Sequence, residues 1–382
     1  MDALQKLRIL GPATRYEPAE EVGDRQRPVR SSRAPADLSD CIHQAVMPGG
    51  QRIALLKTLL TSACERDCTY CAFRSGRDFR RATFTPDELA HVFMDLHRSG
   101  VAEGVFLSSG VAGGGPNTQN RLLDAAEILR HRYGFSGYIH LKIMPGAERD
   151  QIAAAMALAD RVSVNLEAPN ARRLADLAPH KSFDDELLRR LQWIEEIRRQ
   201  MTGKRPSSTT QFVVGAVGEP DVEILATTEY LYRRAGLARA YFSGFSPVDD
   251  TPRADQPPVD PAREHRLYQS SFLLRDYGFS AEELPFDADG NLPLETDPKL
   301  AWAQQNLAQC PVEVNRADRE VLLRVPGIGP VGAQRVLAAR RQGRLRELGD
   351  LRKLRIVADR AAPYILLDGH RPAQQLSLWP VA

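Results

Sequence analysis

Three cysteines, Cys64, Cys68 and Cys71, lie in the run Cys-Glu-Arg-Asp-Cys-Thr-Tyr-Cys, directly after an apolar stretch. This spacing places three thiolates on one tight loop. An iron–sulfur cube held entirely by cysteines needs four of them, so the loop supplies one ligand too few. An iron atom without a protein ligand is free to bind a substrate or a cofactor. The spacing therefore predicts a redox enzyme built around an iron–sulfur cluster.

A zinc site is the alternative use of the same cysteines, with a histidine such as His43 as the missing ligand. Zinc sites usually combine two close cysteine pairs, or cysteines with a histidine at short spacing, and no such partner follows Cys71. We therefore favour the cluster. Of the remaining cysteines, we expect Cys41 to be a small buried residue and Cys310 to be structural.

The elements that must position the cysteine loop alternate between strands and helices. Helical patterns run from Ser182 to Gln200 and begin at the cap Thr85-Pro86-Asp87-Glu88. Apolar, strand-like runs lie at 53–60, 104–107, 138–143, 162–166, 211–217 and 240–245. The alternation predicts an α/β fold with a parallel sheet, closed or partly closed into a barrel, and leaves a doubly wound open sheet as the alternative. Reactive groups of such barrels lie where the strands end, and the cysteine loop follows the first strand.

At 382 residues the chain is long enough for one large and one small domain. We expect an irregular extension at 1–40, a catalytic core at 41–290, a linker at 291–310 and a small helical domain at 311–382. No apolar run is long enough to span a bilayer and no secretory pattern is found, so we expect a cytoplasmic protein without membrane contact. Clustered cysteines agree with a reducing compartment.

A second motif lies near the end of the chain, where Pro326-Gly327-Ile328-Gly329 joins two short amphipathic helical patterns. This arrangement resembles the helix–hairpin–helix motif. Glycines let the turn bend, and they expose backbone amides at the start of the second helix, where a phosphate can bind. We expect Ile328 to plug into the core of the small domain and Arg335 to add positive charge.

Charge is distributed unevenly along the chain. Residues 312–382 hold 13 Lys and Arg against 7 Asp and Glu, although the net charge of the whole chain is only +2. A basic segment that carries a hairpin favours nucleic-acid binding, whereas packing or protein contact is the alternative. A weaker second hairpin pattern covers 351–361, with Arg355 where glycine is expected.

The cysteine spacing, with the aromatic Tyr70 before the last cysteine, resembles the radical S-adenosylmethionine (SAM) superfamily. The resemblance implies an open, partial (β/α)6 barrel in which SAM binds the open iron. One-electron cleavage of SAM would then give a 5′-deoxyadenosyl radical, which abstracts hydrogen from a substrate. In the superfamily, the ends of further strands hold SAM, and a Gly-Gly-Glu-like segment follows the second strand. At that place this chain carries Ser108, Ser109 and Gly110 instead. With Tyr70, Asn165 and Glu167 these residues are the candidates for SAM contacts, and Asn165 and Glu167 are expected on one face of a strand because side chains alternate. Lys142 is expected to be solvated or ion-paired.

From about Cys41 onward the chain is similar to a family of DNA modification or repair radical SAM proteins with a C-terminal helix–hairpin–helix. Besides both motifs, the similarity rests on residues 55–57, 106–110, 137–142, 245–247, 264–269 and 314–317, and on Asp297-Pro298-Lys299, for which the sequence gives no role.

The family resemblance implies a DNA substrate contacted without sequence specificity, an external electron donor, and a partner related to uracil-DNA glycosylase. The further cysteines that the family often carries in its N-terminal segment are missing from 1–40, so no second cluster is implied. Two alternatives remain open. One is an RNA-modifying radical SAM enzyme, and the other is a non-catalytic iron–sulfur protein that binds DNA or acts as a sensor.

Overall fold

The structure, a computed structural model, describes residues 1–11, 14, 38, 41–46 and 52–372. Internal contacts divide the chain into two units. The first comprises 1–219 and 230–264, and the second comprises 220–229 and 265–382. This division differs from the expected boundaries, because residues 265–290 and the expected linker 291–310 both belong to the second unit.

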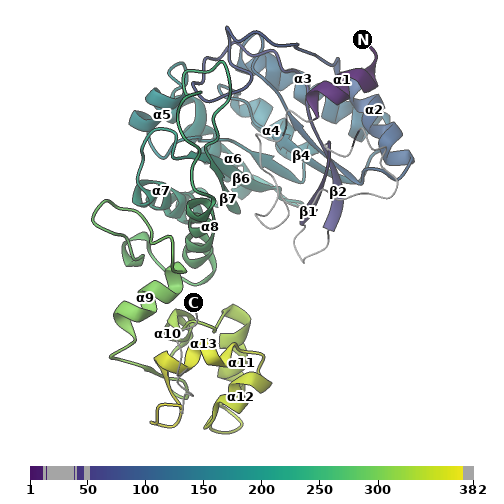
Figure 1. Cartoon of the computed structure of the whole chain (residues 1–382). Helices are drawn as coiled ribbons and strands as arrows, with labels where there is room; N and C mark the ends of the chain where they lie inside the picture. Colours follow the sequence, from purple (N-terminus) through teal and green to yellow (C-terminus); the bar gives the residue numbers. More distant parts are fainter. Residues whose placement is uncertain (12–13, 15–37, 39–40, 47–51, 373–382) are drawn as a thin grey trace. The chain divides into compact units, whose positions relative to one another are not determined.

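The first unit is built on a seven-stranded sheet whose strands are adjacent in chain order. These are β1 (Ile42–Val46), β2 (Arg52–Leu59), β3 (Gly104–Ser108), β4 (Tyr138–Lys142), β5 (Arg161–Ser163), β6 (Ser207–Val214) and β7 (Arg239–Gly244). Strands β2 to β7 are parallel, and β1 is antiparallel to β2. The sheet curls into a half-barrel (Figure 1). Because the strand order never reverses, the doubly wound alternative is excluded and the α/β partial barrel is confirmed.

Strand β1 was not predicted, and its sequence explains why. Ile42-His43-Gln44-Ala45-Val46 mixes polar and apolar residues without a long apolar run, as is typical of an edge strand. Strands β2 and β3, by contrast, were found because they are largely apolar runs, buried along most of their length.

Helices connect the parallel strands, and one more follows β7. They are α2 (Pro86–Arg98), α3 (Gly115–Glu127), α4 (Arg149–Leu158), α5 (Ala171–Leu177), α6 (Arg189–Gln200), α7 (Asp221–Arg234) and α8 (Pro261–Asp276), with a π-helical turn η5 (Phe183–Leu188) before α6. Helix α1 (Ala3–Leu10) corrects part of the irregular extension expected at 1–40, since Asp2 caps it and Leu7 and Leu10 are fully buried. Most of that extension lies outside the described residues. No helix in the described part of the chain is both long and apolar enough to cross a membrane.

The second unit has a core of its own. Its later elements are α9 (Pro298–Asn306), β8 (Val312–Glu313), α10 (Arg319–Arg324), α11 (Pro330–Ala339), α12 (Leu348–Lys353), α13 (Ala358–Ala361) and β9 (Ile365–Leu366). Ile328 is 1% exposed within this core, which confirms it as the plug of the turn between α10 and α11. Ala303 and Leu307 also belong to the core. The segment expected to be a linker is therefore a packed helix.

The start of α2 provides a test of how local sequence contributes to the fold. Thr85 Oγ1 accepts a hydrogen bond from Glu88 N at 3.2 Å, and Glu88 Oε2 accepts one from Thr85 N at 2.8 Å. Replacing Thr85 with Ala removes this reciprocal cap and should lower the free energy of unfolding by about 1 kcal/mol, measured by urea denaturation. Thr85→Ser keeps the hydroxyl and should stay close to wild type. Equal losses in both variants would contradict the assignment.

Candidate functional site

A cavity of about 510 Å³ lies at the C-terminal ends of the strands of the first unit. Its walls come from the cysteine loop after β2 and from the residues at and beyond the ends of β3 to β7. Cys64, Cys68 and Cys71 all line it. Parallel strands end at one edge of a sheet, and this brings residues distant in sequence to the same cavity.

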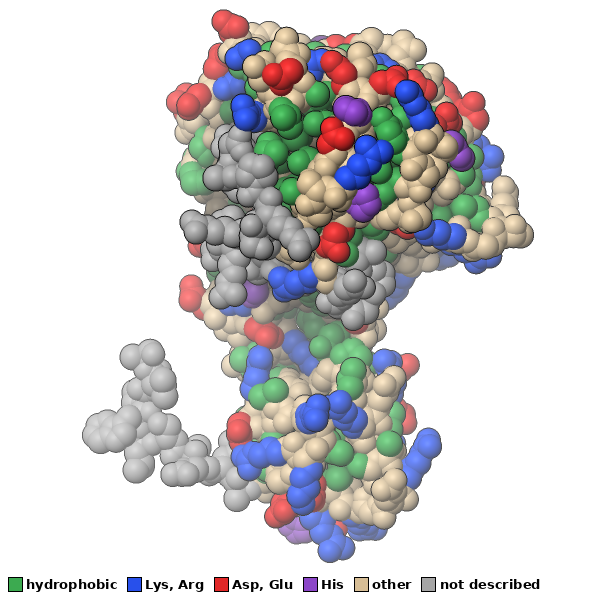
Figure 2. Space-filling view, turned by 90° about the vertical axis from the view of Figure 1, so that its right-hand side faces the viewer, with side chains coloured by type: hydrophobic (Ala, Val, Ile, Leu, Met, Phe, Trp, Pro, Cys, Tyr) green, Lys and Arg blue, Asp and Glu red, His purple; other side chains and the backbone are tan. Residues whose placement is uncertain are grey.

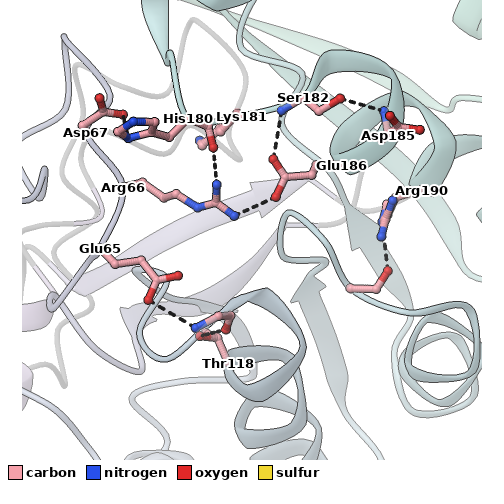
Figure 3. Close-up of polar contacts among 12 residues, drawn as sticks. Glu65, Arg66, Asp67, Thr118, His180, Lys181, Ser182, Asp185, Glu186 and Arg190 are labelled. Carbon is pink, nitrogen blue, oxygen red and sulfur yellow. Dashed lines mark hydrogen bonds and ion pairs between the residues drawn. The ribbon is translucent and has the colours of Figure 1, made fainter.

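The cysteine loop has no regular secondary structure, and its side chains tie it to neighbouring segments (Figure 3). Glu65 Oε2 accepts hydrogen bonds from the amides of Gly113 and Gly114, at 3.0 and 3.2 Å. Arg66 Nη2 bonds to Glu186 Oε1 in η5 at 2.6 Å, and Nη1 donates to the carbonyl of His180. The residues between the cysteines therefore anchor the loop on both sides.

Two more arginines hold this region, and nothing in the sequence pattern singled them out. Arg253 Nε donates to Thr69 Oγ1 at 2.7 Å, and its Nη2 donates to the Asp176 carbonyl at 2.9 Å. Arg81 donates to four main-chain carbonyls at 2.8–3.2 Å, those of Ser62, Phe73, Arg74 and Arg77. Each guanidinium supplies several donors in a rigid plane, which suits it to fixing a loop through its backbone.

Burial disfavours the ionised form of two of the three thiols, those of Cys68 and Cys71. Burial raises the pKa of Cys68 to about 11, whereas the nearby ammonium of Lys181 acts to lower it. Burial also raises the pKa of Cys71, and the other two cysteines add to that effect. The amide of Phe73 donates to Cys71 Sγ at 3.4 Å. Three thiolates in this setting need positive charge beside them, and iron bound to sulfur supplies it.

The structure also bears on whether His43 could join the three cysteines in a zinc site. Within the described residues, no three His, Cys, Asp or Glu side chains converge as the ligands of a single metal ion do. His43 lies in β1 and does not line the cavity. His43 is therefore not placed to complete a zinc site with the three cysteines.

Glu167, one of the predicted SAM contacts, stands out in the cavity wall. Its Oε1 pairs with Lys181 Nζ at 2.7 Å, and each of these side chains is only 8% exposed. Its Oε2 is buried and makes no hydrogen bond of ordinary geometry, although the Tyr70 hydroxyl lies beside the carboxylate. The backbone of Glu167 has a φ of +65°, an unusual conformation for a residue other than glycine. A buried acceptor without an ordinary hydrogen bond, facing a cavity, fits a bound molecule that brings N–H or O–H groups, as SAM does.

The remaining predicted SAM contacts divide into two groups. Tyr70, Ser109, Gly110 and Asn165 line the cavity. Burial raises the pKa of Tyr70, and the neighbouring Glu167 carboxylate raises it further. Asn165 Nδ2 donates to Gln211 Oε1 at 3.0 Å. Ser108 does not line the cavity, because successive residues of a strand face opposite sides and Ser109 takes the inward position.

Gly110 is required by close packing rather than by a ligand. A Cβ atom there would lie 2.3 Å from the carbonyl oxygen of Ala63, so no larger residue fits. The amide of Gly110 donates to Thr61 O at 2.8 Å. The end of β3 therefore lies directly against the start of the cysteine loop.

Three expectations about single residues can now be assessed. Lys142 was expected to be solvated or ion-paired; it is 6% exposed and lines the cavity, so the first of these two expectations is wrong. The reason is its place at the end of β4, where the side chain points into the half-barrel. Cys41 is fully buried beside α1, as expected, and its Sγ donates to Leu7 O. Cys310 is exposed, which does not agree with a buried structural role.

The predicted hairpin residues lie in the second unit. Pro326, Gly327, Ile328 and Gly329 form one wall of a second cavity of about 780 Å³. Gly327 has a φ of +84°, and a Cβ there would meet the carbonyl oxygen of Val357 at 2.4 Å. Arg335 does not reach this cavity, since its Nη1 donates to the carbonyl of Leu354 at 3.1 Å.

The weaker second hairpin pattern has a structural counterpart. Helices α12 and α13 are joined by a turn in which Arg355 has a φ of +57°. This is the left-handed conformation that glycine adopts most easily, so the expected glycine position was identified correctly although an arginine occupies it.

With this geometry established, the family comparison can be stated. Residues 58–231 match the family model described as Radical SAM superfamily. The match starts in β2, directly before the cysteine loop, and covers the cavity walls from β3 to β6. These residues therefore form a radical SAM domain, and the proteins of this superfamily use a [4Fe–4S] cluster and SAM as cofactors. The match does not specify a reaction.

Several solved structures resemble parts of the chain. Methylornithine synthase (PylB) has 16% identity and a TM-score of 0.47, over 59% of this chain and 63% of that one. The hydrogenase maturase HydG from Carboxydothermus hydrogenoformans has 14% identity and a TM-score of 0.45, over 58% of this chain and 51% of that one. The methyltransferase TsrM from Kitasatospora setae has 14% identity and a TM-score of 0.40, over 56% of this chain and 39% of that one. The chain thus spans less than two thirds of each of these proteins. No curated protein matches the chain.

The cysteine assignment predicts which thiols are needed for iron. Replacing Cys64, Cys68 or Cys71 with Ala should in each case abolish the cluster, seen after anaerobic reconstitution as loss of iron and sulfide per chain and of the visible absorbance of the cluster. Cys41→Ala and Cys310→Ala are the matched controls and should retain the full content. A control variant that loses iron as completely as Cys68→Ala would refute the assignment.

The Glu167–Lys181 pair predicts a stability effect in the cluster-free protein. Lys181→Met leaves a buried carboxylate without its partner and should cost about 3 kcal/mol of unfolding free energy, measured by urea denaturation. The double variant Glu167→Gln/Lys181→Met should lose less, because no charge is stranded.

Lys204→Met serves as the control for this pair, since Lys204 is 67% exposed where it pairs with Asp160, and it should change stability by less than about 1 kcal/mol. If the double variant were less stable than Lys181→Met alone, the two side chains would not form the buried pair described here.

Proposed function

We propose that this protein modifies or repairs DNA by radical chemistry at the cavity of the first unit and binds the nucleic acid through the hairpin of the second. The observation that carries the proposal is the presence, in one chain, of a radical SAM domain and of a cavity lined by the Pro326–Gly329 turn together with cationic side chains. Radical formation needs only the radical SAM domain. A polyanionic substrate explains the cavity lined by the turn and the cationic side chains.

When bound, the cluster and SAM supply a 5′-deoxyadenosyl radical, formed with one electron from an external donor, which removes a hydrogen atom from the substrate. Cys64, Cys68 and Cys71 are the residues that would hold the cluster. Tyr70, Ser109, Gly110, Asn165 and Glu167 border the space that SAM would take. Glu167 Oε2, the buried acceptor without an ordinary hydrogen bond, is the atom best suited to receive an amino or hydroxyl group of SAM.

The residues of the chain also restrict what can react. The cavity lies within the half-barrel, and Phe245, Pro247 and Val248 add apolar walls after β7. Such walls keep water away from a reactive intermediate. A base stacked inside a duplex cannot enter a space of this kind, so the target nucleotide would be flipped out, damaged or single-stranded.

Support for nucleic-acid binding comes from the second unit. Residues 312–382 have an excess of six positive charges. Lys and Arg side chains are prominent on the face of this unit turned toward the viewer in Figure 2. The amides of Gly327 and Gly329 donate to no backbone acceptor in the described part of the chain. Free amides beside positive charge bind phosphate groups without reading base sequence.

The proposal predicts that DNA stimulates SAM cleavage. Reconstituted full-length protein, reduced under anaerobic conditions, should release 5′-deoxyadenosine severalfold faster with single-stranded or lesion-containing DNA than without nucleic acid, as measured by chromatography. Cys68→Ala, which should lack the cluster, is the background control.

Other outcomes of this experiment identify the alternatives. Stimulation by RNA but never by DNA would replace the DNA proposal with an RNA-modifying enzyme. A protein with a complete cluster that binds DNA and never cleaves SAM would be an iron–sulfur binding or sensor protein.

A further inference from the structure

The segment Asp297-Pro298-Lys299, for which no role was predicted, has a defined structure at the start of α9. Asp297 caps the helix, since its Oδ1 accepts a hydrogen bond from Leu300 N at 2.9 Å, and Pro298 occupies the first helical position. Lys299 follows, and its side chain reaches the hairpin. Its Nζ donates to the carbonyl oxygen of Ile328 at 2.6 Å. The same Nζ lies 4.6 Å from the centre of the Tyr277 ring.

Lys299 contributes to the wall of the 780 Å³ cavity, together with the hairpin. The rest of the wall comes from the second half of α8 and from Arg319 and Arg360. Lys299 is therefore a cation placed at the hairpin by a different element, and it lies outside the basic segment 312–382 that the sequence singled out.

Two of the cationic side chains that line this cavity form no ion pair with a carboxylate of the described residues. Arg360 Nη2 pairs with Asp297 Oδ2 at 2.9 Å, and Arg275 pairs with Asp276 at 2.9 Å. Lys299 and Arg319 have no carboxylate within ion-pair distance among the described residues. The Gly327 and Gly329 amides, which have no backbone acceptor, border the same space. Two uncompensated cations and two free amides around one cavity are complementary to an anion with several oxygen atoms.

We propose that Lys299 is a phosphate-binding residue of the hairpin site, where its ammonium and the Gly327 and Gly329 amides contact one phosphodiester group and Arg319 supplies a second cation. The proposal rests on the nucleic-acid function proposed above and names a contact of that same site. It assigns the site a residue that precedes the hairpin by almost thirty positions, as α9 and the hairpin are brought together only by folding.

The electrostatic setting of Lys299 makes this contact sensitive to pH. Burial lowers the pKa of Lys299 to about 7, with Arg360 and Arg324 adding to the effect and the carboxylate of Asp297 opposing it. Tyr277, whose own pKa is raised, lies against the amine and stays neutral in this range. A bound phosphate favours the charged amine, so binding takes up a proton. DNA affinity should then fall as the pH rises through 7 and above.

The test is fluorescence anisotropy with a labelled DNA duplex and full-length protein, between pH 6 and 9 at constant ionic strength. Lys299→Met should weaken binding by about tenfold at pH 6.5, remove most of the pH dependence, and reduce the slope of log affinity against log salt by about one. Lys299→Arg should keep strong binding and lose the pH dependence, because a guanidinium stays charged throughout.

Lys353→Met is the matched control. Lys353 belongs to the same unit, is 74% exposed and pairs with Asp350, so this variant should keep the wild-type pH dependence. Lys299→Met with wild-type affinity and pH dependence would overturn the proposal while leaving DNA binding intact. If Lys299→Met does not fold, the arginine variant decides, and wild-type pH dependence in Lys299→Arg would overturn the proposal. Wild-type protein that binds no DNA at all would instead remove the proposed function.

Discussion

Three cysteines on a loop without regular structure can hold a cluster only if the loop keeps one conformation, and hydrogen bonds from arginines to main-chain carbonyls provide that constraint here. Arg81 binds four carbonyls around the loop, and Arg253 reaches Thr69 from beyond β7. Arg66 fastens the loop to η5. Carbonyls that would lack partners in an irregular segment are satisfied in this way, so the loop gains rigidity without helices or strands.

The need to hold the cysteine loop in one conformation explains why segments from early and late in the domain meet at the cavity. Residues that follow β2 would be mobile if only their neighbours in sequence held them. Arg253 and Glu186 belong to segments far along the chain, so the loop is fixed only when the half-barrel is complete. The buried Glu167–Lys181 pair strengthens this arrangement, because Lys181 lies beside both Cys68 and Glu167. Assembly of the sheet and formation of the cluster site are therefore coupled.

The parts of this structure that the sequence predicted are those set by local patterns. Apolar runs identified strands β2 to β7, the Thr85 cap marked the start of α2, and the spacing of Cys64, Cys68 and Cys71 located the site. Asn165 and Glu167 both border the cavity, but they lie beyond the end of β5, so side-chain alternation along a strand does not account for their placement. Ser108 was included although Ser109 takes the inward position. The glycine position in the second hairpin was found even with Arg355 in it, because the backbone pattern around it is local.

What the sequence could not supply depends on contacts between distant segments. Lys181 and Lys299 are ordinary lysines in sequence, and only folding places one beside Glu167 and the other at the Ile328 carbonyl. The expected linker at 291–310 was polar enough to resemble a loop, yet Ala303 and Leu307 pack into the second core. Lys142 was expected to be solvated or ion-paired, and the local sequence around it does not show that its side chain is buried inside the half-barrel.

The most direct test of the account is the electron paramagnetic resonance spectrum of the reduced, reconstituted protein, recorded with and without SAM. The account predicts a [4Fe–4S]⁺ signal whose shape changes when SAM is added, since one iron lacks a protein ligand and is open to SAM. A signal that SAM leaves unchanged, or a protein that takes up zinc and gives no cluster signal, would contradict it.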